Sequence, residues 1–246
     1  MRFSATVIAT VLLGIASPAL AADQRDRDDS TGILSYAKGY SGFANHIEMV
    51  RLDTKDPVGP RNRDTKDHAK SDLNQIIVYY DSAIKHDPKD DDAYFHRGLA
   101  KFYAGALPQA LADLSQASKL DPQYAYYALW IDIIEKRGNM ASGFPKAVSK
   151  INMTKWPAPV VRLFLGQTTP AAVLAAADDP DANTKRGQVC EANFYSGELA
   201  LQQGAKEEAT RLFRLAAAGC PHEFAEGPSA TAELEALGVS QLGVSQ

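Results

Sequence analysis

The sequence has few of the residues on which metal and redox chemistry depend. Only two cysteines occur in 246 residues, which excludes zinc fingers and iron–sulfur clusters held by cysteine. The five histidines form no H-E-x-x-H motif or other close pair, and neither a glycine-rich phosphate loop nor a G-x-S-x-G motif is present. We therefore expect no metal site, no cofactor and no catalytic residue.

Basic residues and long apolar runs are also scarce. The chain has 26 lysines and arginines against 30 aspartates and glutamates, a net charge of −4, which disfavours nucleic acid as a partner. Only the first residues are strongly apolar: Arg2 precedes an apolar run over 3–15, and Ser17-Pro18 precedes a small-x-small sequence ending at Ala21. This pattern predicts a secretory signal over 1–21 that is cleaved near Ala21, with an uncleaved anchor as the alternative. No later run approaches 18 apolar residues, so we expect a periplasmic or secreted protein without a transmembrane segment.

A repeat with a period of 34 residues is present in the rest of the chain. Asp87-Pro88 recurs as Asp121-Pro122, and the clearest unit is 91–124. A second unit is 190–223. Frame positions 8, 20, 24, 27 and 32 are Gly98, Ala110, Leu114, Ala117 and Pro122 in the first unit, and Gly197, Ala209, Phe213, Ala216 and Pro221 in the second.

This frame resembles that of the tetratricopeptide (TPR) family, in which each repeat is a pair of antiparallel helices. The resemblance implies an all-α solenoid of helical hairpins. Gly98 and Ala110 are small enough for two helices to approach closely, Gly105 is suited to end the first helix, and Pro108 to begin the second. We expect a helical hairpin over 91–122.

The other segments fit the frame less well. Residues 22–56 are a degenerate N-terminal repeat, and 57–138 contain repeats of which the first, 57–90, has a good second helix (73–85) but a polar first one. Five prolines divide 139–184 into predicted short helices, among them 159–165 and 171–177 after Thr169-Pro170. Residues 185–238 form a C-terminal repeat with a capping helix, and 239–246 a tail.

Segments 156–166, 190–197 and 232–238 are similar to the periplasmic TPR lipoproteins of the NlpI type, although this chain has no lipid-attachment cysteine after Ala21. That resemblance implies an envelope setting, partners among cell-wall hydrolases and a tail-specific protease, and a homodimer.

The two cysteines occupy positions 1 and 31 of the C-terminal repeat. Because the helices of one repeat are antiparallel, Cys190 should lie beside Cys220. An exported compartment is oxidising, which favours a disulfide over the alternative of two free, buried thiols.

In TPR arrays the first helices line a concave groove, to which positions 2, 5, 9, 12 and 13 contribute. We expect an apolar, exposed strip there that docks a peptide or helix. The alternative is that segments 22–56 or 139–184 cover it. The predicted groove residues are Asp92, Phe95, Leu99, Phe102 and Tyr103 in one helix, and Tyr126, Leu129, Ile133, Lys136 and Arg137 in the next.

These patterns favour a non-enzymatic exported scaffold that binds partner proteins or peptides. One alternative is a homodimeric structural repeat protein. Another is a small-ligand binder or enzyme in which 139–184 forms a lid and Trp156, Phe164 and Glu191 wall a pocket.

Overall fold

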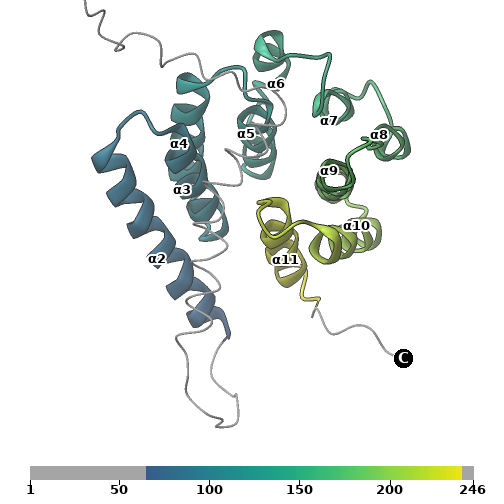
Figure 1. Ribbon diagram of the computed structural model, residues 1–246. Coiled ribbons are helices and arrows are strands. Elements are labelled where there is room, and N and C mark those ends of the chain that lie inside the picture. The colour runs from purple at the N-terminus through teal and green to yellow at the C-terminus, as the bar shows by residue number, and fades with distance from the viewer. Residues whose placement is uncertain (1–64, 240–246) are drawn as a thin grey trace, which may run out of the picture.

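The computed structural model describes residues 65–239, and every regular element in that range is a helix (Figure 1). The all-α expectation is confirmed. The predicted signal over 1–21, the segment 22–56 and the tail after residue 239 lie outside the described residues. The elements are α2 (Thr65–His86), α3 (Asp91–Tyr103), α4 (Leu107–Leu120), α5 (Ala125–Arg137), α6 (Phe144–Ala147), the 3-10 helix η1 (Val148–Lys150), α7 (Ala158–Phe164), α8 (Pro170–Ala176), α9 (Ala182–Gln202), α10 (Lys206–Gly219) and α11 (Glu226–Ala236).

The helical hairpin expected over 91–122 is present as α3 and α4. The Asp90 carboxylate caps α3 by accepting a hydrogen bond from the Ala93 amide at 2.9 Å. Gly105 turns the chain with a φ of +80°, a conformation that glycine adopts without strain. Pro108 lies in the first turn of α4, where no amide hydrogen is needed.

Small residues allow the helices of each hairpin to pack closely, as their spacing predicts. A Cβ atom placed on Gly98 of α3 would lie 2.1 Å from Leu114 Cδ1 of α4. The corresponding Cβ on Gly197 of α9 would lie 2.8 Å from the Phe213 ring of α10. The hairpins α3–α4 and α9–α10 therefore use the same contact at the same frame positions.

Helix α2 differs from the expected repeat. The frame places a break between two helices before residue 73, but Thr65–His86 is one continuous helix. The sequence from Thr65 to Leu73 contains no glycine or proline, so nothing in it ends the helix.

The proline-rich segment forms the short helices that were predicted. Helix α7 ends before Gly166, whose φ is +69°. Thr169 caps α8, its hydroxyl accepting from the Ala172 amide at 3.3 Å. These helices connect α5 to α9 and carry the chain around a curve (Figure 1).

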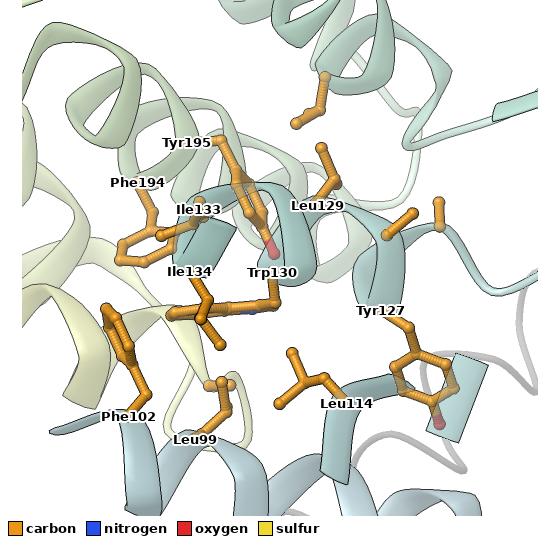
Figure 2. Close-up of a cluster of buried hydrophobic side chains, with 14 of the residues drawn as sticks. Leu99, Phe102, Leu114, Tyr127, Leu129, Trp130, Ile133, Ile134, Phe194 and Tyr195 are labelled. Atoms are coloured by element: carbon orange, nitrogen blue, oxygen red, sulfur yellow. The ribbon is translucent and has the colours of Figure 1, made fainter. Parts of the chain in front are cut away.

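The curve brings α11 back to α3 and α5. We call the inward sides of α3, α5, α9 and α11 the inner face; across it α5 contacts α9, and Tyr103 of α3 and Arg137 of α5 contact α11. Figure 2 shows the apolar part of this contact: Trp130 of α5 lies between Phe102 of α3 and Phe194 of α9, with ring centroids 6.0 and 5.4 Å away. We call the line along which α3 and α5 meet α9 and α11 the seam.

The two cysteines lie at disulfide-bonding distance, with their Cα atoms 4.8 Å apart. The pairing predicted from the antiparallel helices is confirmed. Cys190 is buried on α9, and Cys220 directly follows α10. Because α9 begins at Ala182, well before Cys190, the bond ties the interior of α9 to the end of α10.

Replacing Cys190 and Cys220 together by alanine is expected to lower the free energy of unfolding by about 3 kcal/mol, because the unfolded chain regains the freedom of a 30-residue loop. Urea titration of the oxidised wild type and the double variant measures this loss. Reduced wild type serves as the control and should unfold at the same urea concentration as the variant. A variant as stable as the oxidised wild type would contradict the prediction.

Candidate functional site

The structure buries most of the predicted docking strip. The relative exposures of Phe95, Leu99, Phe102, Leu129 and Ile133 are 1, 1, 6, 0 and 0%. The expectation of an exposed apolar strip is therefore wrong for these five side chains. They belong to the core because a face that can close on other helices removes its apolar area from water.

The alternative of a self-covered strip is correct, and α9 and α11, which were not among the expected covering segments, supply part of the cover. Across the seam, Phe194 of α9 packs on Trp130. On the other side, the Tyr103 hydroxyl donates to the Ser229 carbonyl oxygen of α11 at 3.5 Å. Of the predicted covering segments, 22–56 lies outside the described residues. Segment 139–184 contributes Trp156, whose indole nitrogen donates to Glu191, and Phe164, whose ring centroid lies 5.6 Å from Lys136 Nζ.

The polar groove residues contact other parts of the chain. The Tyr127 hydroxyl donates to the carboxylate of Asp92 at 3.2 Å, and Lys136 pairs with Asp132 at 2.8 Å. Tyr126 and Arg137 are partly exposed, and their polar ends meet carboxylates of α9 and α11. These contacts define the candidate site.

Four glutamates form what we call the carboxylate cluster. Glu191 and Glu198 lie on α9, and Glu226 and Glu233 on α11; their relative exposures are 4, 0, 0 and 1%. On each helix the two glutamates are seven residues apart, about two turns, so both face the same side. Glutamate is almost never fully buried unless it is paired, and four such residues in one interior are unusual.

The first pair of glutamates, Glu191 and Glu226, accepts hydrogen bonds from three aromatic side chains. The Tyr126 hydroxyl of α5 and the Trp156 indole nitrogen each donate to Glu191 Oε2 at 2.6 Å. The Tyr195 hydroxyl donates to Glu226 Oε1 at 3.0 Å. Burial, together with the nearby charge of Glu226, raises the pKa of Glu191 from 4.5 to about 8.

The second pair, Glu198 and Glu233, forms ion pairs with one guanidinium group. Arg137 Nη2 lies 2.8 Å from Glu198 Oε2 and 2.9 Å from Glu233 Oε2, which links α5 to both α9 and α11. Burial and the charge of Glu233 raise the pKa of Glu198 to about 8, although Arg137 acts in the opposite direction. Burial likewise raises the pKa of Glu233. One arginine therefore does not fully offset the cost of burying two carboxylates.

Sequence reasoning identified part of this cluster. Trp156 and Glu191, proposed as walls of a pocket, do lie together, and Phe164 packs near Tyr195 with centroids 5.9 Å apart. Glu198 was missed, although the repeat frame could have found it. Glu191 and Glu198 occupy positions 2 and 9 of unit 190–223, the positions that Asp92 and Leu99 occupy in unit 91–124. Glu226 and Glu233 lie beyond the repeat and carry no such signal.

No protein-family model matches the sequence. Within residues 65–239, no group of three or more histidine, cysteine, aspartate or glutamate side chains has the arrangement of a metal site. The same part of the chain contains no helix whose length and hydrophobicity suit it to span a membrane. The arrangement can bind and release protons inside the fold, and it joins helices that are far apart in the sequence.

Proposed function

We propose that the protein is a non-catalytic, exported scaffold that binds other proteins through the inner face of its helical hairpins. The supporting observation is the contact of α11 with α3 and α5. Tyr103 and Arg137, which were predicted as groove residues, contact Ser229 and Glu233 of this helix. The inner face thus contacts a helix of its own chain, and a partner helix would use the same side chains once the seam opens.

Three features of the chain support the compartment and the class of partner. The sequence of 1–21 has the pattern of a secretory signal, and the cysteines lie at bonding distance, as suits an oxidising compartment. The resemblance to TPR proteins of the NlpI type favours partners among envelope hydrolases or proteases. We propose no nucleic acid partner and no cofactor.

In the alternative of an enzyme, the catalytic groups would be the paired carboxylates of Glu191 and Glu226. A glutamate with a pKa near 8 could act as a general acid, but a substrate must reach it. Glu191 and Glu226 are enclosed by Tyr126, Trp156 and Tyr195. We therefore favour a structural role for the pair.

Self-association through α2 is the second candidate. Val78 and Tyr79 are adjacent on this helix, which lies at one end of the described array, and their exposures of 67 and 50% are the largest among the bulky apolar side chains of the described residues. Burial of such a pair against a second copy would remove apolar area from water.

A photo-crosslinking amino acid placed at Tyr103, Tyr79 or Lys119 separates these proposals. Lys119 is an exposed residue of α4 and is the control. We expect position 103 to crosslink to a protein of the exported fraction of native cells, identified by mass spectrometry and then shown to bind as a purified protein. Crosslinks from position 79 to a second copy would favour the homodimer. Equal yields from all three positions, or no partner at any of them, would contradict docking.

A further inference from the structure

We propose that the carboxylate cluster is a proton-operated latch: its glutamates carry protons while the seam is closed, and loss of these protons to solvent opens the seam between α5 and α11 and exposes the inner face. As a regulation of the docking face, the latch rests on the proposed function for its biological role.

The position of the cluster is the first argument. All four glutamates lie where α9 and α11 face α3 and α5, and none lies between α3 and α4. The buried carboxylate of that hairpin, Asp113, is paired with two cations, Arg97 at 2.6 Å and Lys101 at 2.7 Å. A charge that develops in the cluster therefore acts on the seam and leaves the hairpins intact.

The charges around the cluster are the second argument. Arg137 is shared between Glu198 and Glu233. The buried side chains of α7, α8 and α10, which also pack near α9, are apolar. Ionisation of Glu198 and Glu233 would set two carboxylate charges against one guanidinium, and ionisation of Glu191 would add a third, where these side chains are at most 4% exposed. Such buried charge is costly. The polar groups of the described residues that face the four glutamates include Tyr103 of α3, Tyr126 and Arg137 of α5, Trp156 before α7, and Tyr195 of α9.

The direction of the effect follows from the protonation equilibria. The pKa values of Glu191 and Glu198 are about 8 in the folded chain and near 4.5 when the side chains are exposed. The closed state therefore binds more protons than the open state. Its stability is fully present below pH 4.5 and is lost as the pH rises through about 8. The latch closes in mildly acidic and neutral solution and opens in alkaline solution.

Hydrogen exchange of the full chain at pH 6 and pH 9 tests the latch. Rates are divided by the intrinsic rate at each pH to give protection factors. We expect protection of α11 to fall at least tenfold, because one group with a pKa near 8 would alone change the equilibrium by up to about a hundredfold. Protection of α3 and α4 should change much less. Unchanged protection of α11, or an equal loss in all helices, would overturn the proposal.

Substitution of the glutamates adds a second measurement. Glu191→Gln with Glu198→Gln mimics protonation of the two α9 glutamates, whose pKa values are about 8, and retains the contact of Arg137 with Glu233. This variant should keep α11 protected at pH 9 to within about threefold of its value at pH 6. Glu208→Gln on the surface of α10 is the matched control and should behave as wild type. A pH response of the double variant equal to that of wild type would also overturn the latch. No partner is present in either measurement, so a failure of the latch is distinct from a failure of docking.

Discussion

Arg137→Met is expected to lower the free energy of unfolding at pH 8 by about 3–5 kcal/mol. The guanidinium is the cation shared by Glu198 and Glu233, and its removal leaves two buried carboxylates without it. Breaking a buried pair by removing one partner has a cost of this order, because the remaining charge is buried without compensation. Urea denaturation followed by circular dichroism at pH 8 and at pH 5 measures the effect. The loss should be smaller at pH 5, where the carboxyl groups bind protons.

Two further variants show whether the loss comes from the buried charges. Glu198→Gln and Glu233→Gln combined with Arg137→Met should recover most of the stability, since no unpaired charge remains. Arg211→Met removes an exposed pair with Glu208 on α10 and should change the stability by less than about 1 kcal/mol. If Arg137→Met has no larger effect than Arg211→Met, Arg137 does not close the seam.

Trp130→Ala is expected to lower the free energy of unfolding by about 3–5 kcal/mol, the range for large-to-small substitutions of fully buried aromatic residues. The side chain is 0% exposed and contacts rings of Phe102 on α3 and Phe194 on α9 (Figure 2). The cavity would lie where three helices meet, and none of them can move inward without losing its other contacts. Thermal and urea unfolding give the loss.

Met140→Ala is the control for this prediction, because Met140 is partly exposed and lies in the loop after α5. It should change the stability by less than about 0.5 kcal/mol. Trp130→Phe, which leaves a smaller cavity, should fall between the two. A Trp130→Ala variant as stable as Met140→Ala would show that α5 and α9 do not share the core described here.

Trp130 and Arg137 close the seam in different ways. Trp130 contributes apolar contact, whose strength depends little on pH, whereas Arg137 and the glutamates contribute contacts that change with protonation. The two substitutions should therefore differ in their pH dependence, although their effects on stability are similar in size. The seam is therefore stabilised by an apolar contact whose strength changes little with pH and by polar contacts whose strength changes with protonation.

Elements whose causes are local could be predicted from the order of the residues alone. Gly105 and Pro108 mark the turn between α3 and α4, Thr169 caps α8, and the spacing of Cys190 and Cys220 within one hairpin places them together. These features depend on a few neighbouring residues or on two adjacent helices, so a one-dimensional pattern contains them.

Which faces of the helices are covered depends on the packing of the whole fold. The repeat frame placed Phe102, Leu129 and Ile133 correctly on the inner face, but it does not state how strongly successive hairpins curve. Curvature adds up over many packing contacts between α5 and α9, including the short helices that have no repeat pattern, and it brings α11 back to α3 and α5. For this reason the sequence left open whether the strip is covered, and it did not reveal the pairing of Arg137 with Glu233 or the meeting of the α9 glutamates with those of α11.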